Sequence, residues 1–187
     1  MKFLMRILPL SLVFSACCLP VHTGDSSSIN QTGPSHLMQI HIESWGTSRF
    51  TGLLGLQFHD RGLTYMLLDA TGITLLESQV TQDGDFTVIR AAGKLGESGL
   101  PDFLASSLRK IYLIKPATVP CADTLLLRFC EEKMENNRFR KYASTGPFTL
   151  WKAEFDSTGP TTDWPAVTFS EPWFGVSLTL ADLNQHQ

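Results

Sequence analysis

Val176-Ser-Leu-Thr-Leu-Ala-Asp-Leu183 is the clearest strand signal in this sequence. Val176, Leu178 and Leu180 alternate with small or polar residues, as expected for a strand with one buried and one solvated face. The same alternation recurs over residues 38–43, where the folded part of the chain is expected to begin. We therefore predict a fold that is built mainly of half-buried strands.

Turn signals divide the sequence between these two strands. Asp60-Arg61-Gly62, Thr71-Gly72 and Gln82-Asp83-Gly84-Asp85 separate apolar runs in the first half, which is typical of hairpins. Gly-Pro and Glu-Pro pairs punctuate the second half beyond residue 136. The predicted strands span residues 38–43, 50–58, 63–69, 73–81, 86–91, 139–143, 148–156, 166–170 and 174–183.

Helical spacing replaces the alternation in the middle of the chain. Apolar residues recur at three- and four-residue intervals from Pro101 to Leu113, which predicts an amphipathic helix. Residues 123–134 fit either a helix capped by Asp123 or a buried strand, and the pattern slightly favours the helix. The predicted fold class is α+β: a strongly curved antiparallel sheet, an open half-barrel, that one or two helices cover.

The N-terminus has the features of an export signal. Lys2 and Arg6 precede an apolar stretch over residues 7–14, which is too short to span a bilayer, and Ser15-Ala16-Cys17 follows. Phe14-Ser15-Ala16-Cys17 resembles the bacterial lipobox, so acyl chains on Cys17 are expected to anchor the protein. The alternative is an ordinary secreted protein with chance cysteines. We predict a lipoprotein signal peptide over residues 1–16, a flexible tether over 17–36 and one folded domain over 37–187.

Charge and composition narrow the range of partners. The formal net charge is −3, and removal of the signal peptide with its two cations makes it more negative. No run of Lys or Arg forms a basic patch, so nucleic acid is not an expected partner. Residue 18 is not the aspartate that retains some bacterial lipoproteins in the inner membrane. The predicted location is therefore the periplasmic face of the outer membrane.

Five segments follow one another along the chain: Tyr65 to Glu77, Ser107 to Lys110, Phe148 to Phe155, Trp164 to Phe169 and Val176 to Leu183. In this order they resemble the LolA and LolB family of lipoprotein carriers and receptors. The resemblance implies a half-barrel with an apolar cavity that holds a lipid or the acyl chains of a lipoprotein. The resemblance also suggests a role in lipoprotein localisation. The receptor has an exposed leucine where this chain has Thr71 before Gly72, so the resemblance implies the fold and the cavity more strongly than lipoprotein transfer.

An apolar cavity of this kind needs no catalytic motif. Burial of a fourteen-carbon chain contributes on the order of 10 kcal/mol before the cost of association, at about 0.8 kcal/mol per methylene. The alternative for each candidate residue is an ordinary core position. The candidate cavity residues are Leu54, Leu56, Phe58, Met66, Leu68, Phe103, Leu104, Leu108, Trp151 and Phe155.

The sequence offers little for chemistry. The nucleophile-elbow motif requires a glycine two residues after Ser98, and Leu100 stands there. The five histidines are scattered, so we expect no metal, no cofactor and no enzyme activity. A second hypothesis is a structural or assembly lipoprotein that has no cavity and binds a periplasmic protein through exposed aromatics such as Trp45, Trp164 and Trp173.

Cys121 and Cys130 are candidates for a disulfide, since the expected compartment is oxidising. A continuous helix or strand between them would hold their Cα atoms too far apart. A disulfide would require the chain to double back around residues 122–124, and it would then argue against the helix predicted over 123–134.

Overall fold

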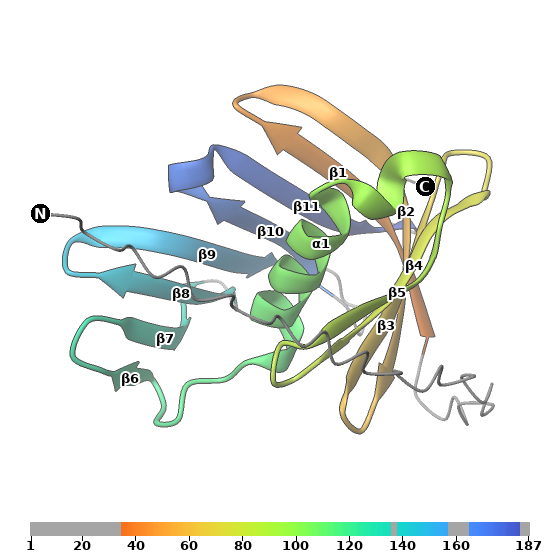
Figure 1. Ribbon diagram of the computed structural model, residues 1–187. Coiled ribbons are helices and arrows are strands. Elements are labelled where there is room, and N and C mark those ends of the chain that lie inside the picture. Colours follow the sequence, from red (N-terminus) through yellow and green to blue (C-terminus); the bar gives the residue numbers. More distant parts are fainter. Residues whose placement is uncertain (1–34, 136–137, 157–164, 184–187) are drawn as a thin grey trace, which may run out of the picture. The chain divides into compact units, whose positions relative to one another are not determined.

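Eleven antiparallel strands form one open sheet in the computed structural model (Figure 1). The structure describes residues 35–135, 138–156 and 165–183, which lie within one compact unit, Gln31–Gln187. The predicted signal peptide, Cys17 and all but the last two residues of the predicted tether lie outside the described residues. The strands are β1 (Ser35–Ser44), β2 (Thr47–His59), β3 (Gly62–Leu68), β4 (Thr74–Thr81), β5 (Phe86–Ala91), β6 (Cys121–Asp123), β7 (Arg128–Lys133), β8 (Phe139–Thr145), β9 (Phe148–Asp156), β10 (Ala166–Glu171) and β11 (Val176–Asp182).

The strand order is β5-β4-β3-β2-β1-β11-β10-β9-β8-β7-β6. Each half of the chain is a meander of neighbouring hairpins, and the halves join where the first strand pairs with the last. Ile40 lies opposite Leu180 and Ile42 opposite Leu178 across this joint, and all four side chains are buried. The alternation in both strands therefore places their apolar residues on the same face of the sheet.

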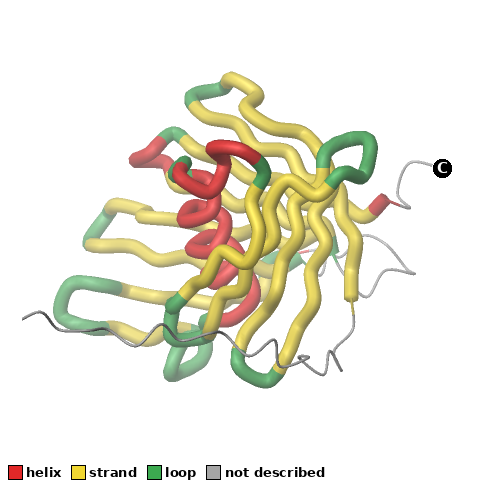
Figure 2. The backbone as a smooth tube through the Cα atoms, turned by 45° about the vertical axis from the view of Figure 1, so that its right-hand side comes forward, coloured by secondary structure: helices red, strands yellow, loops and turns green. Residues whose placement is uncertain are grey.

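The helix α1 (Leu100–Leu108) lies against this apolar face (Figure 2). It follows the 3-10 turn η1 (Gly93–Glu97) and continues as the π-helical turn η2 (Arg109–Leu113). Leu104, Leu108 and Ile111 are fully buried in the same core cluster as the inward-facing strand residues. The buried hydroxyl of Tyr65 on β3 donates a hydrogen bond to the carbonyl of Pro101, at 2.9 Å. This bond fixes the start of the helix on the sheet.

A buried lysine holds the other end of the helical segment. The Nζ of Lys141 on β8 donates to the carbonyls of Ile111 at 3.1 Å and Ile114 at 3.4 Å. These carbonyls lie at the C-terminal end of η2, where a cation also interacts favourably with the helix dipole. Burial lowers the pKa of Lys141 from its usual 10.5. Lys141 thus caps this helix end with a charged group that is largely shielded from water.

Two parts of the predicted architecture require correction. All nine predicted strands and the helix over residues 101–113 are present within a few residues of their expected bounds. The helix over 123–134 is wrong, because this region forms the turn after β6 and then β7. The α+β half-barrel class is also wrong, because the described residues are mostly β and form an open sheet with a single short α-helix.

A disulfide joins Cys121 to Cys130 and explains the failed helix. The two cysteines lie opposite each other in the β6–β7 ladder. The chain doubles back between them over residues 124–127, slightly later than the point that we considered. A hairpin brings the two Cα atoms within bonding range, which a helix of nine residues cannot do.

Candidate functional site

The predicted cavity residues divide between the core and the surface. Leu54, Leu56, Leu104 and Leu108 are buried in the core cluster between α1 and the sheet. Trp151 and Phe155 are buried in the same cluster, and Phe58 and Phe103 pack against it with part of their surface exposed. Side chains of the core therefore occupy the face on which we expected the ligand.

Met66 and Leu68 lie on the opposite face of the sheet. Their neighbours Tyr65 and Leu67 face inward and are fully buried, because β3 places these two opposite Leu56 and Leu54. Met66 and Leu68 therefore do not face α1, as the predicted cavity required, because a shift by one residue along a strand reverses the face. The register against β2 is the signal that identifies the correct pair.

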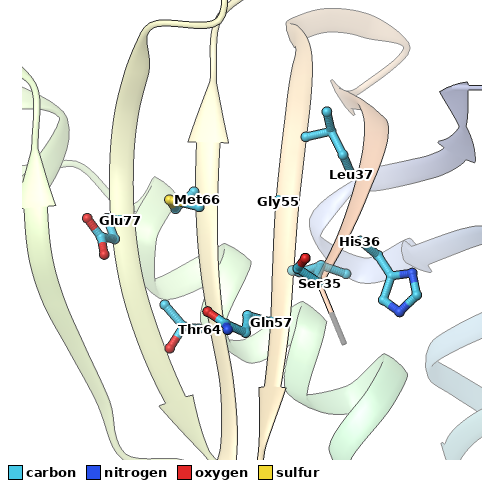
Figure 3. Close-up of a pocket in the computed structure, with 9 residues that line it drawn as sticks. Ser35, His36, Leu37, Gly55, Gln57, Thr64, Met66 and Glu77 are labelled. Carbon is cyan, nitrogen blue, oxygen red and sulfur yellow. The ribbon is translucent and has the colours of Figure 1, made fainter. Parts of the chain in front are cut away.

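The outer face of the sheet carries a groove of about 430 Å³ (Figure 3). Leu37, Gly55, Met66 and Glu77 form a row across β1 to β4 in this groove. A Cβ at Gly55 would meet only Met66, at 3.6 Å or more. The groove exists because glycine leaves room between two larger neighbours.

A second hollow of about 430 Å³ lies beside α1. Phe103 and Ser106 of the helix line one side. Phe174, in the turn before β11, and Val176, the first residue of β11, line the other. Lys110 forms an ion pair with Glu171 in the same hollow. Of the ten predicted cavity residues, Phe103 lines this hollow, while Leu56 and Met66 line the outer groove.

Ser98 and His41, two of the residues that we considered for chemistry, make local contacts in the structure. Ser98 Oγ donates to the carbonyl of Leu95 at 2.6 Å within the turn after η1. His41 contacts Thr51 and Glu43 on the sheet. Within residues 35–135, 138–156 and 165–183, no group of three or more His, Cys, Asp or Glu side chains could hold a metal ion. In these same ranges, no helix is long and apolar enough to cross a membrane.

Exposed apolar side chains gather instead at the turns along one end of the sheet. The turns β1–β2, β6–β7, β8–β9 and β10–β11 all lie at this end, since every second turn of an antiparallel meander does. Figure 1 shows these four turns along one side of the sheet. Six side chains at the turns each leave at least half of their surface exposed. We call them the apolar turn edge: Trp45, Leu125, Leu126, Phe148, Trp173 and Phe174.

Three of these turns are locked together by aromatic contacts. The ring of Trp45 lies against Gly175, which has a left-handed φ of +59°, and the Trp45 amide donates to the Gly175 carbonyl at 2.6 Å. Trp173 packs edge-on against Phe148, with ring centroids 5.4 Å apart. Its indole N–H donates to the carbonyl of Thr149 at 2.9 Å. The aromatic half of the edge is therefore an ordered surface.

The leucine half of the edge is held by its own turn. The amide of Thr124 donates to the carbonyl of Leu127 at 2.8 Å, and the Leu127 amide donates to Thr124 Oγ1 at 3.1 Å. Leu125 and Leu126 lie between these anchors, and Leu125 is 98% exposed. The disulfide closes the hairpin a few residues away. The run of leucines that we interpreted as a buried face is thus directed to the outside.

Comparison with known proteins gives only distant matches. No family model matches the chain. Two probable receptor-like protein kinases of Arabidopsis thaliana are 25% and 23% identical to it over 141 residues. The match includes 72% of this chain but 15% of each kinase, so the chain spans about a seventh of their length.

The resemblance to the LolA and LolB family is therefore corrected. No member of that family is among these matches, which are to plant receptor-like kinases. The segments that suggested it are strand patterns marked by glycine or proline, and such patterns recur in many antiparallel sheets. The candidate sites are the apolar turn edge, the outer groove and the hollow beside α1.

Proposed function

We propose that this protein is a non-enzymatic envelope lipoprotein, anchored at Cys17 to the outer membrane, whose domain binds its partner through the apolar turn edge. The proposal keeps the predicted anchor and moves the binding site from a closed cavity to the surface. Like the second of the two functions that the sequence suggested, it assigns binding to exposed aromatics such as Trp45 and Trp173. Trp164, the third residue named there, lies outside the described residues.

The observation that carries the proposal is the concentration of exposed aromatic and leucine side chains at one end of the sheet. Single exposed apolar residues are ordinary on protein surfaces, whereas a contiguous group of large ones is typical of an interaction site. Tryptophan is also enriched among the residues that dominate binding energy. The contacts of Trp45 with Gly175 and of Trp173 with Phe148 fix the positions of these side chains in the absence of a partner.

A lipid ligand in a hollow is the second candidate function. The outer groove and the hollow beside α1 each measure about 430 Å³, which is within the usual range of small-molecule sites. Both are open at the surface and carry charged residues, Glu77 in one and the pair Lys110 and Glu171 in the other. A long acyl chain would lie beside these charges, so we rank this function below the surface contact.

Site-specific photo-crosslinking in intact cells tests the proposal. A photoreactive phenylalanine analogue would replace Trp45, Leu125 or Trp173 in the full chain, and Ile89 on β5 would serve as the control. Ile89 is half exposed but lies at the far end of the strand order. We expect adducts to protein or lipid at the three edge positions and none at position 89. Equal yields at all four positions, or adducts at none, would contradict the proposal.

A crosslinker at Met66 distinguishes the second candidate. Met66 lines the outer groove and is far from the four turns along the strand direction. A lipid adduct at position 66, with no adduct at the edge, would favour a ligand in the groove. Adducts at the edge alone would favour the surface contact.

A further inference from the structure

We infer that the partner of the apolar turn edge is the interfacial layer of a lipid bilayer. This inference rests on the proposed function and adds the nature of the partner.

The residue types are those of a membrane interface. The edge consists of two tryptophans, two phenylalanines and two leucines. Tryptophan prefers the headgroup level of bilayers, because its ring is apolar and its N–H is polar. Leu125 and Leu126 have no polar atom in their side chains and are the most exposed members of the edge. Transfer of both leucine side chains from water to the acyl region below the headgroups is favourable.

The edge also has the form of a rim. Its four turns belong to eight strands that are consecutive in the sheet, β2-β1-β11-β10-β9-β8-β7-β6. At about 4.8 Å between strands, these eight strands extend over roughly 34 Å. Protein-binding hot spots cluster near the centre of a patch. A row of tips at one end of a sheet instead suits a broad, flat surface, which several turns can reach together.

The leucine turn carries no net charge that would require anionic lipid for binding. Arg128 follows the leucines directly, and it pairs with Asp123 on the facing strand, at 3.5 Å between Nε and Oδ1. Thr124, at the base of the turn, is uncharged. The turn therefore approaches a bilayer without net charge, and we expect it to bind zwitterionic lipid as well as anionic lipid.

The chain before β1 is long enough for this orientation. β1 begins with Ser35 at the end of the sheet opposite Trp45, and its ten residues span about 33 Å. Seventeen residues lie between the predicted anchor Cys17 and Ser35, and an extended chain of that length reaches roughly 60 Å. The domain can thus turn its apolar edge toward the bilayer that holds its own anchor.

Tryptophan quenching by brominated lipid tests the inference. The lipidated protein, purified from membranes with Trp164 replaced by Phe, would be reconstituted into phosphatidylcholine vesicles with and without brominated acyl chains. Trp45 and Trp173 then report on the edge, and the buried Trp151 provides a reference in the core. We expect brominated lipid to reduce the emission at least twofold, equally with and without added phosphatidylglycerol.

Two variants make the test specific. Trp45→Phe with Trp173→Phe should abolish the quenching and leave the emission of Trp151. Leu125→Ser with Leu126→Ser should weaken the quenching severalfold while circular dichroism stays unchanged, because both leucines are exposed. Unchanged emission in brominated vesicles would overturn the inference. If edge crosslinks to a protein accompanied that result, the proposed function would stand with a protein partner; if crosslinks were also missing, both would fall.

Discussion

The indole of Trp45 covers the α-carbon of Gly175 so closely that a Cβ at residue 175 would lie 2.4 Å from the ring. The two residues belong to different turns, β1–β2 and β10–β11, and their strands join the two halves of the chain. A glycine is therefore required at position 175 for two reasons. It adopts the left-handed backbone conformation without strain, and it leaves space for the Trp45 ring. This contact ties the aromatic edge to the central joint of the sheet.

Gly175→Ala should be more destabilising than Gly146→Ala. Both glycines have left-handed φ values, +59° and +54°, but a Cβ at Gly146 would meet nothing within 4 Å. The backbone cost of about 1 kcal/mol is common to both variants, whereas Gly175→Ala must also displace the Trp45 ring. We expect losses of about 1 kcal/mol for Gly146→Ala and about 2 kcal/mol or more for Gly175→Ala in urea unfolding. Equal losses would show that Trp45 does not depend on Gly175.

Because of Lys141, the free energy of unfolding should depend on pH in the alkaline range. Burial lowers the pKa of Lys141 below 10.5, so between the folded pKa and 10.5 the unfolded chain binds a proton that the folded chain has released. The free energy of unfolding then rises with pH in this window. In Lys141→Met this contribution is absent. The stability difference, wild type minus variant, should increase with pH as the pH approaches 10.5 from below, and a flat difference would contradict the lowered pKa.

Tyr65→Phe tests the bond between sheet and helix. The variant removes the hydroxyl that donates to Pro101 and leaves that carbonyl without this donor, at an expected cost of about 1–2 kcal/mol. Burial raises the pKa of Tyr65 to about 12, so the unfolded chain ionises first and the wild type should lose stability between pH 10 and 12. Urea unfolding of both proteins over this range should show the loss to be smaller in the variant.

Removal of the disulfide should loosen the leucine turn. Cys121→Ala with Cys130→Ala opens a loop of nine residues in the chain, which corresponds to about 2–3 kcal/mol in the chain-entropy description. β6 is short and lies at the edge of the sheet, so the effect should be local. Hydrogen exchange should accelerate at the Thr124 and Leu127 amides and stay unchanged in β1. Acceleration throughout the sheet would show that the hairpin supports the whole fold.

The strands could be predicted from the sequence because their periodicity is local. Met38, Ile40 and Ile42 alternate on one face, and Leu178 and Leu180 meet them across the joint. The helix after Gly99 was also predictable, because its apolar residues recur at helical spacing around Pro101. Both signals depend only on residues that are neighbours in the chain.

The candidate site was harder to predict because it depends on distant pairing. Three leucines in a row at residues 125–127 favour burial by composition, and only the pairing of Cys121 with Cys130 identifies them as a turn. The pairing of Met66 with Gly55 determines on which face of the sheet Met66 lies. Alternation within β3 alone does not determine this face. Trp45 was an expected surface residue, but its contact with Gly175 joins segments 130 residues apart.

Hydrogen exchange of the lipidated protein on native envelope membranes tests the central claim most directly. We predict that amide hydrogens at residues 124–127 and 172–175 exchange more slowly on membranes than in detergent, with no change at residues 54–58 beneath α1. Slower exchange at 54–58 or across the outer groove, with the turns unaffected, would contradict it.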